Sequence, residues 1–200
     1  IKGVSDEFIA FVVAEWELRE DYNGDGVSDS EDYIPGVYDV STGEITYLRM
    51  PPLRRSFYDR SWVRLSGSRL VAVLADRPEI VYYDLRSGEL VTTPARGSDP
   101  VIAGDIIAYL DSVTGEISYY DIASGDVVRT GISPRTAELS TEIQLTVQGR
   151  RIAFHDNEEV RNEDLNGDGQ LTEPVVGVYD IDTGVLRYLK TGGLVFEGDR

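Results

Sequence analysis

Hydrophobic residues in this chain come in short runs of a few residues, separated by polar stretches that often contain Gly or Ser. Four of these runs look alike: Ile9-Ala10-Phe11, Leu70-Val71-Ala72, Ile107-Ala108-Tyr109 and Ile152-Ala153-Phe154. Short apolar runs bounded by turn residues are typical of β-strands, whereas helices show a 3.6-residue period. No segment has that period, so we expect strands throughout and no helix beside any loop.

A single hairpin signal occurs four times, each time after one of these runs. A β-rich run ends in Asp, a turn with Gly follows, and a second β-rich run begins, at 37–44, 82–89, 119–126 and 178–185. Gly supplies the positive φ that such turns need. The turn aspartates are 45, 37 and 59 residues apart, and each repeat offers about four strands. Repeats of roughly 40 residues with four strands indicate β-propeller blades.

We therefore expect an all-β fold, a β-propeller of about four four-stranded blades. The blades are expected at approximately 1–50, 61–95, 99–132 and 141–191, with the start of a further blade at 193–200. This last segment favours a piece of a larger propeller, and a closed four-bladed ring is the rarer alternative. A β-sandwich is the competing fold, but it would not require the same turn four times.

The first and fourth repeats are longer than the others in the same hairpin. From the opening of the second strand to the turn aspartate they have 30 and 28 residues, against 14 in the second and third repeats. The extra segments hold most of the negative charge: 15–32 carries −7 and 156–173 carries −6, out of −17 for the chain. Such concentration of charge in two short segments indicates cation sites rather than a generally solvated surface.

Both insertions contain the motif D-x-N-x-D-G, at 21–26 and 164–169. Calcium takes roughly six to eight oxygen ligands, which alternate residues of a curled loop can supply, and Gly permits the sharp turn. The ligands expected in the first loop are the side chains of Asp21, Asn23, Asp25, Asp29 and Asp32 and the carbonyl of Val27, with Glu15 folding back. Those expected in the second loop are the side chains of Asp164, Asn166 and Asp168 and the carbonyl of Gln170.

The second loop lacks an acidic residue at the twelfth position, which is Val175, and Thr172 is a weak ninth ligand. Glu173 is the nearest residue that can complete the shell, and Glu158 or Glu163 can fold back. Magnesium suits such loops less well, because it prefers fewer protein ligands and more water.

A D-x-N-x-D-G loop between two strands, followed by Val-Tyr-Asp-x-x-Thr-Gly, resembles the calcium-blade version of TolB-like propellers. The likeness covers essentially the whole chain as repeats. Integrin-type FG-GAP propellers carry similar loops, and Asp29 fits their ninth ligand, but their Phe-Gly and Gly-Ala-Pro segments are missing. The resemblance implies two structural calcium ions, an extracellular or cell-envelope location, and a binding role inside a larger protein.

Other function classes find little support. The negative charge repels nucleic acid and anionic lipid, and no apolar run reaches the roughly 18 residues of a membrane span. There is no cysteine, His155 is the only histidine, and no G-x-S-x-G segment is present. We therefore expect a calcium-stabilised module for binding or scaffolding and no enzyme. The alternative is a substrate-gating propeller of a larger extracellular hydrolase or peptidase.

Two features suggest partner contacts, with a protein or other ligand, with another copy, or with further blades of a parent chain. The aromatic residues Trp16, Tyr22, Tyr33, Tyr58 and Trp62 can form a binding surface. The Arg-rich segment 50–60 is either a solvated connector or an arm that docks on an acidic neighbour.

Overall fold

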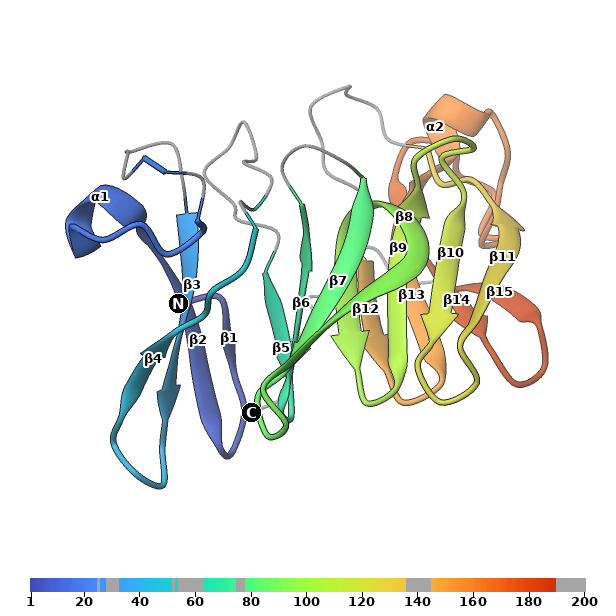
Figure 1. Cartoon of the computed structure of the whole chain (residues 1–200). Helices are drawn as coiled ribbons and strands as arrows, with labels where there is room; N and C mark the ends of the chain where they lie inside the picture. The colour runs from blue at the N-terminus through green and yellow to red at the C-terminus, as the bar shows by residue number, and fades with distance from the viewer. Residues whose placement is uncertain are drawn as a thin grey trace.

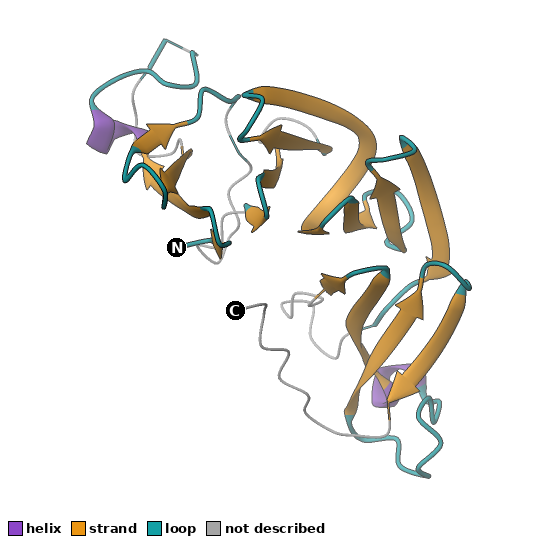
Figure 2. Cartoon of the chain, turned by 90° about the horizontal axis from the view of Figure 1, so that it is seen from below, coloured by secondary structure: helices purple, strands orange, loops and turns teal. Residues whose placement is uncertain are grey.

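The computed structural model describes residues 1–24, 26–27, 33–51, 53, 63–74, 78–135 and 145–189. In these ranges the protein is built from antiparallel strands in three sheets, with two single-turn helices (Figure 1). Seen end-on, the sheets stand side by side in an arc around a common centre (Figure 2). This is the architecture of a β-propeller, and it confirms the predicted all-β fold class. Among the described residues, no helix is long and apolar enough to cross a membrane.

Each sheet is formed by strands that follow one another in sequence. The first has the order β1 (Gly3–Val4), β2 (Phe8–Ala14), β3 (Tyr33–Asp39) and β4 (Ile45–Tyr47). The last has the order β12 (Leu145–Gln148), β13 (Arg151–Asn157), β14 (Pro174–Asp180) and β15 (Val185–Leu189). The middle sheet has seven strands: β5 (Arg64–Ser66), β6 (Arg69–Val73), β7 (Glu79–Asp84), β8 (Glu89–Ala103), β9 (Ile106–Asp111), β10 (Ile117–Asp121) and β11 (Asp126–Ile132).

The expected blades at 61–95 and 99–132 are joined in the seven-stranded sheet, because β8 is continuous over 15 residues. Its first part pairs with β7 as far as Arg96, and its second part pairs with β9 from Gly97 onward. The pairing changes partner at Gly97, where an added Cβ would overlap the carbonyl of Leu110. The number of blades and their bounds stay predictions.

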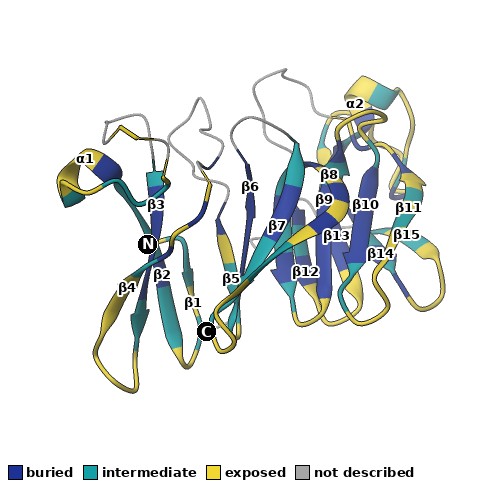
Figure 3. Cartoon of the chain, viewed as in Figure 1, coloured by how far each residue is buried: buried dark blue, intermediate teal, exposed yellow. Residues whose placement is uncertain are grey.

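The core lies between neighbouring repeats and not within any one of them. Figure 3 shows where its buried residues lie along the strands. We call the side of a repeat that faces the preceding repeat its upstream face, and the opposite side its downstream face. Three buried clusters join a downstream face to the next upstream face: Ala10 and Val37 with Leu70 and Ala72, Val71 and Ile80 with Ile107 and Tyr109, and Ala108 and Ile117 with Ile152 and Phe154. Each large side chain buried in this way contributes about 1.5–3 kcal/mol.

The two long repeats share a close approach between β-strands. Gly36 pairs with Phe11 and Gly177 pairs with Phe154, and a Cβ at either glycine would overlap the facing ring. The rings make edge contacts with Tyr47 and Tyr188, at centroid distances of 6.2 and 6.3 Å. The same packing therefore supports the strands on either side of both acidic insertions.

The expectation that no helix adjoins the acidic loops is wrong. Single turns of helix, α1 (Glu15–Leu18) and α2 (Glu158–Arg161), follow β2 and β13 directly. Each ends at a residue with left-handed backbone, Arg19 (φ 56°) or Asn162 (φ 54°). One turn is too short to leave a periodic pattern in the sequence. A strand follows each loop, which differs from the helix–loop–helix arrangement of an EF-hand.

Candidate metal centre

The loop of the fourth repeat is folded around the side chain of Asp164. Its Oδ1 accepts hydrogen bonds from the backbone N–H groups of Gly167 (2.7 Å) and Asp168 (3.1 Å), and its Oδ2 accepts one from Gly169 (2.9 Å). Gly167 and Gly169 have φ of 73° and 86°, which glycine adopts without strain. The first Asp of the motif therefore organises the loop by binding its backbone N–H groups, and the second Asp of the motif, Asp168, lies at the turn.

Glu158, the first residue of α2, lies completely buried beneath this loop. Its Oε1 accepts hydrogen bonds from the backbone N–H groups of Leu165 (2.7 Å) and Asn166 (3.1 Å). Its Oε2 is also buried, and within the part of the chain that the structure describes it has no hydrogen-bond partner. A buried carboxylate oxygen without a partner is costly, because it loses hydration and gains nothing in exchange.

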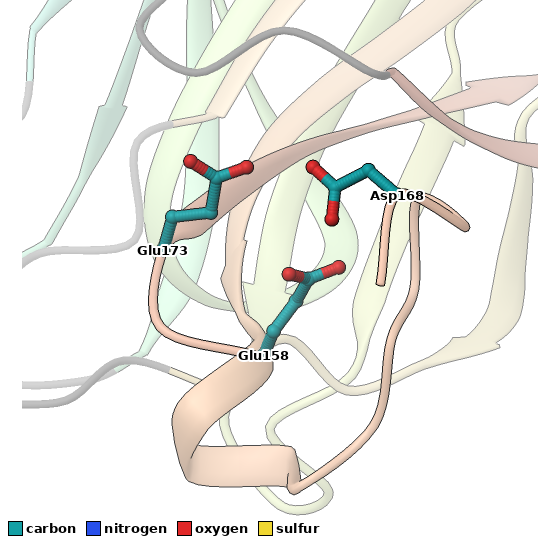
Figure 4. Close-up of side chains that lie close together, drawn as sticks. All are labelled: Glu158, Asp168 and Glu173. Atoms are coloured by element: carbon teal, nitrogen blue, oxygen red, sulfur yellow. The ribbon is translucent and has the colours of Figure 1, made fainter. Parts of the chain in front are cut away.

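Three carboxylates converge at this place. Oxygens of Glu158, Asp168 and Glu173 all lie within 4.8 Å of one another, and Figure 4 shows the three groups turned toward one another. The amide nitrogen of Asn166 lies 3.2 Å from Oδ2 of Asp168 and 3.5 Å from Oε1 of Glu173. Two unit charges about 4 Å apart repel by about 1 kcal/mol in water and about 4 kcal/mol near a protein surface. An all-oxygen set of this charge fits a hard divalent cation.

The loop of the first repeat has backbone hydrogen bonds like those that surround this site. Glu15 is completely buried, and its Oε1 accepts from the backbone N–H groups of Tyr22 (2.5 Å) and Asn23 (3.0 Å). Oδ1 and Oδ2 of Asp21 accept from Gly24 (2.6 Å) and Gly26 (2.9 Å). Glu15 thus occupies the place that Glu158 has in the fourth repeat.

The remaining predicted ligands have mixed outcomes. Asp25, Asp29 and Asp32 lie outside the described residues. Val27 is described and exposed, as is Gln170, whose N–H donates to Oδ1 of Asp168 at 2.8 Å. Of the two residues expected to fold back, Glu158 is the buried one, whereas Glu163 is exposed. Which of these atoms bind a cation stays a prediction.

The counterpart of Glu173 in the first loop is found by its distance from the strand that follows. It comes directly before β14, as Asp32 comes directly before β3. Counting forward from the first Asp, in the manner of an EF-hand, places these two residues at different loop positions. Counting back from the returning strand makes them counterparts, and this signal was available in the sequence.

A buried ion pair anchors α2, and sequence reasoning missed it. Asp156 is only 1% exposed. Both of its carboxylate oxygens accept a hydrogen bond from Nε of Arg161 at 2.8 Å, and Nη2 of Arg161 lies 2.7 Å from Oδ2. The hydroxyl of Tyr188 also donates to Oδ2, at 3.0 Å. Backbone N–H groups of Arg135 and Asn157 also donate to Oδ1, each at 2.9 Å. The hydrogen bond with Asp156 raises the pKa of Arg161, and burial followed by the charge of Asp156 raises the pKa of Tyr188.

This ion pair distinguishes the two loops. The residues of the first repeat at the same offsets from Glu15 are Val13 and Leu18, both apolar. The turn before the second loop is therefore held by charge-assisted hydrogen bonds, and the turn before the first loop has no such pair at these positions.

The remaining candidate residues are spread over several elements. Trp16 in α1 is 53% exposed, and Tyr22 lies 5.5 Å from Tyr47 and 5.8 Å from the guanidinium of Arg49, measured to ring centroids. His155 is half-buried in β13. Tyr58, Trp62 and most of the Arg-rich segment 50–60 lie outside the described residues.

Comparison with known proteins identifies the fold and nothing finer. No protein-family model and no curated protein matches the sequence. Among solved structures, the tricorn protease has a TM-score of 0.51 and 17% identity, covering 95% of this chain and 18% of that chain. Puromycin hydrolase has a TM-score of 0.50 and 14% identity, covering 84% and 26%. TolB from Acinetobacter baumannii has a TM-score of 0.47 and 20% identity, covering 82% and 39%.

The tricorn protease and puromycin hydrolase are β-propeller proteins, in agreement with the fold described above. The chain spans well under two thirds of the length of each of them.

Proposed function

We propose that this chain is part of a β-propeller that binds two calcium ions, one in each acidic loop. The observation that carries the proposal is the unsatisfied, buried Oε2 of Glu158, which lies in a cluster with the carboxylates of Asp168 and Glu173. A divalent cation would supply the missing partner and cancel the repulsion among the three groups. The first loop is assigned a second ion because Asp21 and Glu15 make the same backbone contacts as their counterparts.

Calcium suits this set better than magnesium. The donors come from a helix turn, a glycine-rich loop and a strand start, and they can be joined by backbone carbonyls and water in an irregular shell. Calcium accepts such shells of roughly six to eight oxygens, whereas magnesium demands near-octahedral geometry and keeps several waters.

The ion has a structural role in this proposal. Each loop joins two long strands of one sheet, β2 to β3 and β13 to β14, so a cation there fixes the connection between them. The propeller then presents its surfaces for binding a protein or another ligand, without catalysis of its own. An extracellular or cell-envelope location belongs to the same proposal and follows from the likeness of the loops to calcium-blade propellers.

A second function is suggested by two of the structural neighbours. The tricorn protease and puromycin hydrolase are hydrolytic proteins of which this chain covers 18% and 26%. A propeller of this kind can gate substrate access to a hydrolase domain in the same polypeptide. The likeness itself concerns the fold alone, and a downstream hydrolase domain in the full-length protein would decide for this alternative.

Removal of calcium is expected to lower the melting temperature and to open both insertions to proteolysis before the middle sheet. At a hundredfold excess over Kd, each ion adds about 2.7 kcal/mol to the free energy of unfolding. Thermal unfolding with calcium and with a chelator, followed by circular dichroism, measures the first effect, and limited proteolysis measures the second. Identical melting curves in both conditions would contradict a structural role.

A further inference from the structure

The chain that leaves the third repeat docks beside the acidic loop of the fourth. Three residues follow the end of β11, and the middle one is buried although both of its neighbours are exposed. The backbone N–H of Arg135 donates to Oδ1 of Asp156 at 2.9 Å, and the carbonyl of Ser133 accepts a hydrogen bond from Nη2 of Arg161. This connecting segment, residues 133–135, is therefore held at both ends by the buried ion pair at α2, which lies at the same edge of the propeller as the end of β11 (Figure 1).

The second repeat has the same docking place without a charge. Leu74 stands four residues after Leu70, as Asp156 stands four residues after Ile152. Leu74 forms a β-bridge with Leu53, which belongs to the connection from the first repeat, and both leucines are 4% exposed. An apolar contact docks the incoming chain there, in a repeat that has no acidic insertion. The ion pair of the fourth repeat therefore does more than docking alone requires.

The ion pair and the carboxylate cluster share one short segment of chain. Asp156 precedes Glu158 by two residues, and Arg161 belongs to the same helix turn as Glu158. Glu158 holds the backbone N–H groups of Leu165 and Asn166 through Oε1, and its Oε2 is buried. The turn α2 is thus bound to the third repeat through Arg161 and to the acidic loop through Glu158. A cation on Oε2 would fix the same turn from which Arg161 holds the connecting segment.

We propose that calcium in the fourth repeat also locks its junction with the third repeat, with Asp156 and Arg161 as positioning residues. This inference rests on the proposed calcium site. The two residues act through α2, which they hold so that the carboxylate of Glu158 lies with those of Asp168 and Glu173. Groups that orient a metal ligand in this way change metal affinity about 10–100-fold when they are removed. Because linkage is reciprocal, docking of the connecting segment favours calcium by the same factor by which calcium favours docking.

The two acidic loops then have different roles. In the first repeat Val13 and Leu18 stand in place of the ion pair, so an ion there fixes only the connection between β2 and β3. In the fourth repeat an ion fixes the connection between β13 and β14 and also resists separation of the third and fourth repeats.

Calorimetric titration of calcium into single-site chains tests the change in affinity. Glu15→Gln should leave only the site of the fourth repeat, and Glu158→Gln only that of the first. The double substitution Asp156→Val/Arg161→Leu gives the fourth repeat the apolar residues of the first. It should raise Kd at least about tenfold in the Glu15→Gln chain, and by less than about twofold in the Glu158→Gln chain. Circular dichroism in calcium-free buffer checks that each chain is folded.

The outcomes separate this inference from the calcium site on which it rests. If the double substitution leaves Kd unchanged in the Glu15→Gln chain, the positioning role is wrong and the calcium site stands. An equal rise of Kd in both chains would show a general loss of stability and would also overturn the positioning role. If the Glu15→Gln chain binds no calcium, the fourth repeat has no calcium site and no lock.

Amide hydrogen exchange of the wild-type chain, followed by NMR, tests the coupling without any substitution. Saturating calcium should slow exchange at the N–H of Arg135 by about tenfold, the same factor as in the titration. Ser112 is the control: it is exposed, and its N–H donates to the carbonyl of Arg96 at 3.1 Å, outside both acidic loops. Its exchange should be alike with calcium and with a chelator. If exchange at Arg135 is also alike in both, in a chain that binds two ions, calcium does not lock this junction.

Discussion

Replacement of Asp156 by alanine is expected to lower the free energy of unfolding by about 3 kcal/mol. Loss of one partner of a buried ion pair usually costs about 3–5 kcal/mol, because the other charge is left buried and unpaired. The side chain of Arg161 is 21% exposed and can keep part of its hydration, which places the expected cost at the lower end. Urea denaturation, followed by circular dichroism in calcium-free buffer, measures the change.

The first repeat supplies the control for this experiment, because Val13 and Leu18 stand where the fourth repeat has Asp156 and Arg161. The double variant Asp156→Val/Arg161→Leu removes both charges together and should cost less than Asp156→Ala alone. If the double variant is at least as destabilised as Asp156→Ala, the ion pair does not carry the stability assigned to it.

Replacement of Glu158 by glutamine is expected to change the free energy of unfolding in opposite directions with and without calcium. Glutamine keeps an oxygen for the N–H groups of Leu165 and Asn166 but removes the buried charge. In chelator the variant should therefore be more stable than the wild type by about 1 kcal/mol or more, because one carboxylate leaves the cluster with Asp168 and Glu173. With calcium at a hundredfold excess over Kd the wild type gains about 2.7 kcal/mol from the ion at this site. The variant does not bind that ion but keeps its advantage of about 1 kcal/mol, so it should be less stable than the wild type by up to about 1.7 kcal/mol.

The matched control is Glu159→Gln, which removes the same charge from an exposed position in the same helix turn. Its effect should be small and alike in both buffers. If the difference in stability between Glu158→Gln and the wild type is the same with and without calcium, Glu158 does not belong to the site.

The all-β propeller fold could be predicted from the sequence because the four repeats place equivalent residues in equivalent strands. The runs at Ile9, Leu70, Ile107 and Ile152 all become second strands of their repeats, and each turn aspartate ends a third strand. What the pattern did not reveal was the joining of two expected blades into one sheet. Where β8 changes partner, Gly97 fits closely against Leu110, and hydrophobic patterning does not encode such a fit.

The candidate site was predicted in its chemistry but only partly in its arrangement. The D-x-N-x-D-G motif and the charge count identified the loop. Glu173 was predicted as the nearest residue able to complete the shell, and Glu158 or Glu163 as the residue that folds back. The burial of Glu158 depends on α2, a single turn that leaves no periodic signal. Asp156 and Tyr188 are 32 residues apart, and their contact follows from the pairing of β13, β14 and β15 rather than from any local motif.

Calorimetric titration of calcium into the metal-free chain is the most direct test of the central claim. The account predicts binding of two calcium ions per chain, with one ion remaining in Glu158→Gln. Absence of any binding heat in the wild type, at temperatures chosen to exclude a cancelled enthalpy, would contradict the assignment of both loops as calcium sites.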